Sequence, residues 1–293
     1  SALRFSPVQQ SENPLRFVFF TVLGSHSFMM GSEIALARAL RHRGHDVHMV
    51  LCDGLLAACE NRNTNNQKKW ISICKNCALK GRSMAKAAGI TTHFLSELLA
   101  SANDEEADRI LETEDYGHTV ESALFRYFRV GRLSDTPDEK EQADHVRNAC
   151  RMTGRVAIAV SRLAPDRILM SHGVYSSWAP ALQMFNRLGI PTAVYNKGKR
   201  RNSVVLNWVK GVMDWDVSQE WERVKDRELS SSELDAIRAY LGSRVTHTGD
   251  ALRYNFGEIE DRERTLKRYE LDENRPIFVL FTNVLWDAAS AQK

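Results

Sequence analysis

The sequence predicts an α/β fold in which a mostly parallel sheet is covered by helices on both faces. Residues 17–23 form a nearly unbroken apolar run, which is typical of a strand buried on both sides. Residues 32–43 then carry apolar side chains at helical spacing and are followed by Gly44, a residue that favours helix ends. A second apolar strand is predicted at 45–51. Strand, helix and strand in this order pair in parallel with a right-handed connection.

The rest of the chain continues this pattern with a helical insertion. Residues 94–163 are mainly helical, apart from an acidic loop predicted at 134–141. Apolar runs then predict further strands. These lie at 167–170, 190–195 and 277–282, and helices are predicted at 95–102, 120–132, 143–163, 179–188 and 229–241.

The chain has 293 residues, a length that predicts about two domains. We interpret residues 1–15 as a disordered polar arm and 16–270 as the first domain. Within that domain, residues 52–89 form an excursion that contains cysteines and has no clear periodicity. Residues 271–293 are interpreted as the start of a second domain.

Composition narrows the class of protein. A hydrophobic content of 43% and a charged content of 26% are ordinary for a globular chain. The net charge of +3 is too small to indicate nucleic-acid binding. No apolar run reaches the length of a membrane span and no secretory signal is recognisable, so we expect a cytoplasmic protein with reduced thiols among its five cysteines.

The loop after the first predicted strand carries the first candidate catalytic residues. It lacks the second glycine of a dinucleotide fingerprint and the Lys-Ser or Lys-Thr pair of a phosphate loop. His26 stands at the carboxyl end of the strand, where open α/β sheets bind ligands, and Glu33 follows within two helical turns. His26 is therefore a candidate general base. Its alternative role is to cap the helix or to satisfy a buried polar group.

A second loop of the same kind follows the strand at 167–170. It contains Ser171, His172, Gly173 and Tyr175, so that two strands end in loops with a histidine near a glycine. Loops at the same edge of a sheet converge on one crevice, and this repetition predicts a site there.

A basic loop follows the strand at 190–195. Lys197, Lys199 and Arg200 could form a clamp for phosphate or for an acidic sugar. The alternative interpretation is a solvated surface turn.

Four cysteines lie within a short stretch. Cys52, Cys59, Cys74 and Cys77 end in a Cys-x2-Cys pair of the kind found in structural zinc sites. The first pair is more widely spaced than zinc sites usually are, and unliganded thiols are the competing interpretation.

Aromatic and basic residues alternate over residues 120–133. This pattern is compatible with a helix that rests on an anionic membrane, but a core helix with outward-reaching arginines is the commoner explanation and the one favoured here.

Several of these segments, taken in order, resemble a known family. The segments are Arg43-Gly44-His45-Asp46-Val47, residues 165–175, Gly189-Ile190-Pro191 and residues 278–287. Together they resemble bacterial capsule and surface polysaccharide glycosyltransferases of the two-domain GT-B type. The resemblance runs from Arg16 to the end of the chain and implies a Rossmann-like first domain that binds the acceptor. The second domain, which would bind the nucleotide sugar, is then present only in its first residues.

The resemblance also implies roles for the candidate residues. It implies glycosyl transfer from a nucleotide-sugar donor to a glycan or lipid-linked acceptor, with no required cofactor, in a protein of the cytoplasm or the periphery of the inner membrane. The implied catalytic residues are His26 and then Glu33. The implied acceptor residues are His172, Tyr175, Lys197, Lys199 and Arg200, and the donor-side residues are Asn283 and Asp287.

Two other functions compete with this one. A sugar-nucleotide epimerase resembles the same two-domain architecture, and a non-catalytic module that binds a glycan or a lipid carrier needs only the first domain.

Overall fold

A computed structural model describes residues 11–64, 70–198, 200, 203–208, 211, 217–246 and 261–278. These residues belong to two compact units. The first takes its described residues from Ser1–Asn196 and Val205–Asp216, and the second from Lys197–Val204 and Val217–Val284. The predicted boundary near residue 270 falls inside the second unit and stays a prediction.

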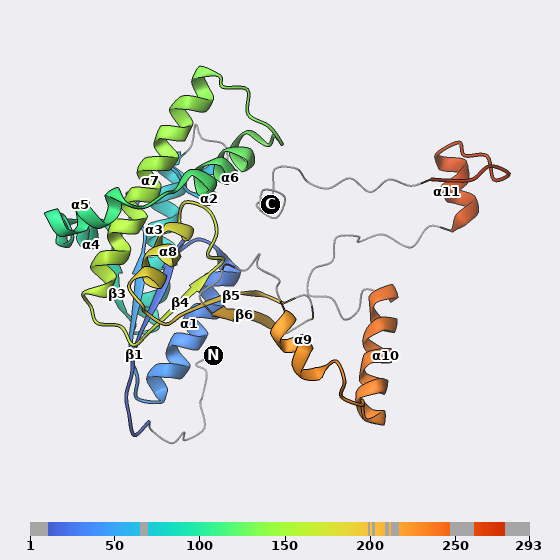
Figure 1. The fold of residues 1–293 in the computed structure, drawn as a ribbon, viewed down its shortest axis with the longest axis horizontal. Helices are drawn as coiled ribbons and strands as arrows, with labels where there is room; N and C mark the ends of the chain where they lie inside the picture. The colour runs from blue at the N-terminus through green and yellow to red at the C-terminus, as the bar shows by residue number, and fades with distance from the viewer. Residues whose placement is uncertain are drawn as a thin grey trace. The chain divides into compact units, whose positions relative to one another are not determined.

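Six strands form one sheet (Figure 1). Their order is β3-β2-β1-β4-β5-β6, and every pairing from β3 to β5 is parallel. This confirms the predicted α/β class and gives the strand order of Rossmann-like folds. The strands are β1 (Arg16–Val22), β2 (Asp46–Leu51), β3 (Thr91–Phe94), β4 (Arg167–Ser171), β5 (Thr192–Lys197) and β6 (Val204–Trp208).

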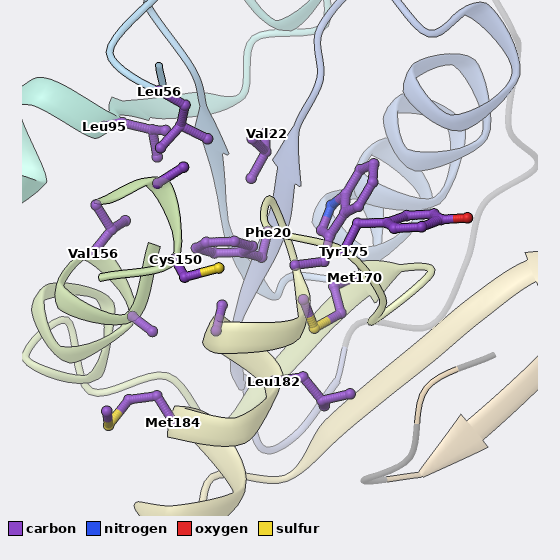
Figure 2. Packing of buried hydrophobic residues seen from close by; sticks show 14 of the residues in the cluster. Phe20, Val22, Leu56, Leu95, Cys150, Val156, Met170, Tyr175, Leu182 and Met184 are labelled. Atoms are coloured by element: carbon purple, nitrogen blue, oxygen red, sulfur yellow. The ribbon is translucent and has the colours of Figure 1, made fainter. Parts of the chain in front are cut away.

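Alternate residues of β1 enter two separate cores. Phe19 packs with apolar residues of α1 (Ser27–His42) and α3 (Trp70–Ala87) on one face. Phe20 packs on the other face with α7 (Pro137–Ser161) and α8 (Ala179–Arg187). Figure 2 shows Phe20 at the centre of this second core, with the Cys150 sulfur directed at its ring. Burial on both faces explains why β1 is apolar throughout.

The remaining helices complete the two units. In the first unit, α4 (Leu95–Ser101), α5 (Glu105–Glu112) and α6 (Gly117–Phe128) precede the long helix α7, and α2 (Glu60–Thr64) follows β2. In the second unit, the described helices are α9 (Ser218–Val224), α10 (Ser231–Thr246) and α11 (Arg262–Arg268).

The interpretation of residues 52–89 as lacking regular structure was wrong, because α2 and α3 lie there. Helix α3 buries Cys77, Gly81 and Ala85, which are spaced four residues apart and share one helix face. A stripe of three small residues gives little hydrophobic signal in a polar segment. The small side chains of this stripe nevertheless let α3 pack closely on the loop after β1.

The prediction of a loop at 134–141 was also wrong for its second half. Helix α7 begins at Pro137, and Thr136 caps it. The Thr136 hydroxyl accepts a hydrogen bond from the Glu139 amide, while the Glu139 carboxylate accepts one from the Thr136 amide. This reciprocal pair is a capping box. The sequence pattern Thr-x-x-Glu with a following proline was the signal that could have placed the helix start.

Two further differences concern the strands. Strand β6 was not predicted, because its exposed Val204, Leu206 and Trp208 follow a basic loop rather than a turn signal. Of the strand predicted at 277–282, Ile277 and Phe278 lie outside any strand, and the later positions lie outside the described residues.

Candidate functional site

The strand order puts the topological switch point of the sheet between β1 and β4. The chain builds β1, β2 and β3 outward in one direction and then returns to add β4 on the other side of β1. At such a switch point the loops after neighbouring strands diverge and leave room for a ligand at the carboxyl ends of the strands. We refer to this place as the crevice and define it by the loops 22–26 and 172–178.

Both strands that border the crevice end in the same strained turn. After β1, the Leu23 amide donates to the Thr21 carbonyl at 2.6 Å, and Val22 between them has a φ of 58°. After β4, the Gly173 amide donates to the Ser171 carbonyl at 2.7 Å, and His172 has a φ of 60°. Because Phe20 is in register with Met170, the two turns begin one residue beyond a paired position.

These turns are costly for the residues that make them. A positive φ is unfavourable for any side chain and is a clear outlier for a β-branched valine. Each such residue costs about 1–3 kcal/mol and persists only where the surrounding structure holds it. The structural counterpart of His172 is therefore Val22 and not His26, which corrects the predicted repetition of the two loops.

His26 is the residue that precedes α1 and caps it. Its Nδ1 accepts a hydrogen bond from the Met29 amide at 3.4 Å, and its side chain is exposed. Although the residue is exposed overall, partial burial of its ring, together with nearby Lys80, lowers the pKa of His26, and its own backbone acts in the opposite direction. A neutral ring that accepts through Nδ1 carries its proton on Nε2. His26 thus acts as a cap and offers a donor, and its role as a base stays a prediction.

Glu33 lies on the side of α1 that faces away from solvent. It is 1% exposed, and its Oε1 accepts a hydrogen bond from the Tyr195 hydroxyl at 2.7 Å. Burial raises the pKa of Glu33 to about 7, against the opposing effect of the Thr21 and Tyr195 hydroxyls. A carboxyl group enclosed in this way links α1 to β5 through the Tyr195 hydroxyl. Its predicted direct role in catalysis stays untested.

The loop after β4 holds two of the five predicted acceptor residues, His172 and the buried Tyr175. His172 lies 5.4 Å from Trp178, measured between ring centroids. Arg126 of α6 donates to the Tyr175 hydroxyl at 2.9 Å, and its guanidinium carbon lies 4.9 Å from the centroid of that ring. Figure 2 shows the Tyr175 hydroxyl directed away from the apolar cluster.

A buried carboxyl group completes this polar wall. Glu60, the first residue of α2, is buried, and this burial raises its pKa. Contacts with Ser177 and the positive charge of Arg126 act against that effect. Glu60 was missed because α2 was not predicted, and Arg126 was missed because residues 120–133 were interpreted together as one aromatic and basic helix.

The loop after β1 is held by α2 and α3. Lys80 donates to the Ser25 carbonyl at 3.4 Å, and Asn61 donates to the Ser25 hydroxyl at 3.0 Å. Gly24 lies so close to Gly81 that a Cβ at either position would meet backbone of the other within 3.0 Å. Lys80 therefore adds a positive charge beside the amino end of α1, a feature that sequence reasoning missed because α3 itself was missed.

The four clustered cysteines lie in the loop after β2 and in α3. Burial raises the pKa of Cys52 and of Cys59, which keeps both as thiols rather than thiolates. Arg62 donates to the Cys74 sulfur at 3.2 Å. Throughout the described part of the chain, no three His, Cys, Asp or Glu side chains are grouped as a metal would require. The zinc site on Cys52, Cys59, Cys74 and Cys77 stays a prediction without structural support.

The predicted basic clamp lies apart from these residues in the chain. Lys197 is the last residue of β5, and the Arg200 guanidinium carbon lies 5.0 Å from the ring centroid of Tyr240. Lys197, Arg200 and Tyr240 belong to the second unit. Lys199, Asn283 and Asp287 lie outside the described residues.

Helix α6 belongs to the core, as the favoured interpretation expected. It buries Val120, Ala123 and Leu124, and Arg126 points to Tyr175. Among the helices that the structure describes, none combines the length and the apolar character needed to cross a membrane.

Comparisons with known proteins give no relative: no family model, no curated protein and no solved structure matches this chain.

Proposed function

We propose that this protein is a glycosyltransferase that moves a sugar from a nucleotide-sugar donor to a glycan or lipid-linked acceptor. The two matched turns at the carboxyl ends of β1 and β4 are the observation that supports this proposal most. Both turns are strained, and strain of this kind is concentrated at functional sites. The resemblance of the sequence to GT-B glycosyltransferases supplies the choice of reaction.

In the proposed reaction, an acceptor hydroxyl attacks the anomeric carbon of the donor sugar. The hydroxyl proton passes to a base, the bond from the anomeric carbon to the diphosphate oxygen breaks, and the nucleoside diphosphate leaves with the bonding electrons. His26 is the proposed base, and its ring must release the Met29 amide before Nδ1 can take the proton. The 3.4 Å length of that hydrogen bond makes the release inexpensive.

Negative charge on the leaving diphosphate needs stabilisation. The first turn of α1 contains no acidic residue, and Lys80 lies beside it. Free amides at a helix start and a nearby lysine both favour an anion. His172 and Tyr175 are proposed to shape the acceptor side of the same crevice.

The proposal is tested with the protein expressed from its natural gene and a panel of labelled nucleotide sugars. We expect label to reach a glycan or lipid acceptor, and we expect His26→Ala to lower kcat about a hundredfold, as removal of a general base does. The matched control is His118→Ala, which removes an exposed histidine of α6.

Other outcomes would replace the proposal. If His26→Ala stays within about threefold of the wild type, His26 is not the base. Deuterium from solvent at C2 of the sugar would identify an epimerase. Glycan binding without turnover of any donor would identify a binding module.

A further inference from the structure

A hollow lies in the first unit, and none of its lining residues belongs to the loops 22–26 and 172–178. It has a volume of about 680 Å³, which is within the usual range for small-molecule sites. We call it the α6–α7 cleft. It is formed by the loop after β2 with α2, the end of α6 and the start of α7. Its side chains include Arg62, Tyr127, Phe128, Glu141, Gln142 and His145.

One wall of the cleft is a single face of α7. Asp138, Glu141, Gln142 and His145 all line it, because residues three, four and seven positions apart share a helix face. Among the described residues, the side chains of Asp138 and Gln142 make no hydrogen bond, and Glu141 approaches only the His145 ring, at 3.8 Å. These groups therefore remain available for a ligand.

Helix α6 contributes two aromatic rings to the cleft. Tyr127 and Phe128 meet edge to face, with ring centroids 4.7 Å apart and an angle of 65° between their planes. Two rings at a large angle cannot both stack on one flat aromatic ligand. They can contact a ligand that has a curved apolar face.

The charge of the cleft limits the ligand further. Burial raises the pKa of Tyr127, and the negative charges of Glu141 and Asp138 act in the same direction. Arg62 lies in the part of the lining that does not belong to α7, and it donates to the Cys74 sulfur and to the Ala57 carbonyl. Both carboxylates of the lining, Asp138 and Glu141, belong to α7. The wall formed by α7 is therefore electronegative and disfavours an anion.

We propose that the α6–α7 cleft binds a neutral saccharide. A sugar ring has one face of C–H groups that packs on Tyr127 and Phe128, and adjacent hydroxyls that suit carboxylate, amide and imidazole groups. Carboxylates accept from two hydroxyls, while Gln142 both donates and accepts. The cleft thus matches a polyhydroxylated ligand better than it matches a flat or an anionic one.

This inference does not depend on glycosyl transfer. Arg126 contacts Tyr175 in the crevice, whereas the next residue, Tyr127, lines the cleft, so α6 borders both places. A saccharide that binds the cleft can be an acceptor for the crevice or a ligand held for another purpose. Direct binding measures the cleft alone and leaves the question of transfer to the donor screen.

The test uses saturation-transfer NMR on the whole chain with maltose, lactose and cellobiose, and with digalacturonic acid as the anionic comparison. At least one neutral disaccharide is expected to bind with a Kd in the range of about 0.1–10 mM. Gln142→Ala and Tyr127→Ala are each expected to raise that Kd about tenfold, the loss of one good contact. Tyr269→Ala, which removes an exposed tyrosine of the second unit, is expected to leave it unchanged.

Each remaining outcome overturns the proposal. The cleft does not bind neutral saccharides if none of the three gives a signal at about 20 mM, a concentration about twice the upper end of the expected Kd range. The same conclusion follows if both cleft variants bind like the wild type, or if digalacturonic acid binds as well as the neutral sugars. Thermal unfolding of each variant shows that it is folded, and Gln142→Ala removes only a partly exposed side chain on a helix surface.

Discussion

The crevice and the α6–α7 cleft differ in how their residues are held, although α6 borders both. The crevice is built from strained backbone, a close approach of two glycines and buried carboxyl groups. The cleft is built from side chains that project from regular helices and are partly or fully exposed. A geometry that is costly and rigid suits chemistry, which requires fixed groups, whereas an exposed helix surface suits reversible binding.

The largest expected effect comes from the glycine contact under the crevice. Gly24→Ala would put a Cβ 2.7 Å from the Cys77 carbonyl oxygen and 2.7 Å from the Gly81 Cα. Both are backbone atoms of α3 and cannot rotate away, so we expect a loss of about 3 kcal/mol in the free energy of unfolding. Chemical denaturation measures it.

Gly31→Ala is the matched control for that substitution. A Cβ at Gly31 has no atom within 4 Å, and Gly31 lies inside α1. We expect this variant to gain about 0.5–1 kcal/mol, because alanine is the better helix former. Equal effects of the two substitutions would show that the close packing of α3 on the loop after β1 is not what holds the crevice.

The same contrast shows which parts of the fold can be predicted from sequence. Strands β1, β2 and β4 were predictable because burial on both faces leaves long apolar runs. Helix α3 was not, since its buried stripe consists of Cys77, Gly81 and Ala85, and small residues carry little hydrophobic signal. The start of α7 was predictable in principle from the capping box at Thr136.

The sequence predicted two loops that follow paired strands, while the site itself and the roles of its residues stay predictions. The carboxyl ends of β1 and β4 follow from strand order, and His26, His172 and Tyr175 do lie in the loops there. The positive φ of Val22 has no sequence signal, because a β-branched residue is the last expected in that conformation. The cleft was missed because its lining comes from three segments that meet only in the folded chain.

The buried carboxyl group of Glu33 should make the stability of the protein depend on pH, which an exposed carboxyl group would not do. Its pKa is about 7 in the folded protein and about 4.5 as an unperturbed group, so the folded state binds more protons between these values. Stability must therefore fall as pH rises from about 4.5 to about 7 and stay low above it. We expect Glu33→Gln to remove this loss, which amounts to about 3 kcal/mol.

Denaturant unfolding of the wild type and of Glu33→Gln at pH 5 and pH 8 measures the change in the free energy of unfolding between the two pH values. Glutamine keeps an acceptor for the Tyr195 hydroxyl, so the substitution tests the charge and not the hydrogen bond. Glu112→Gln on the exposed face of α5 is the control and should not alter the difference between the two pH values. A wild type whose stability does not fall more than that of Glu33→Gln would contradict the burial argument.

Substitutions at two adjacent residues of α6 allow a direct comparison of the crevice with the α6–α7 cleft. Arg126→Met removes the donor to Tyr175 and the positive charge near buried Glu60, and we expect a loss of about 2 kcal/mol in unfolding free energy. Tyr127→Ala removes one ring of an edge-to-face pair at the cleft, for which about 1 kcal/mol is expected. Thermal denaturation of both variants tests the order, and the reverse order would mean that the cleft side of α6 carries more of the fold.

The smallest expected effect is electrostatic and reports on the crevice alone. Lys80 lies beside the loop after β1, and its positive charge contributes to lowering the pKa of His26, after the larger effect of burial. Lys80→Met removes the charge and keeps most of the side-chain length, so the pKa of His26 must rise, while partial burial still keeps it below the ordinary value of a histidine. An NMR titration of the His26 ring protons in the wild type and in Lys80→Met measures this shift. If the His26 titration does not move, Lys80 does not act on the crevice, and the positive charge proposed for the leaving diphosphate must come from elsewhere.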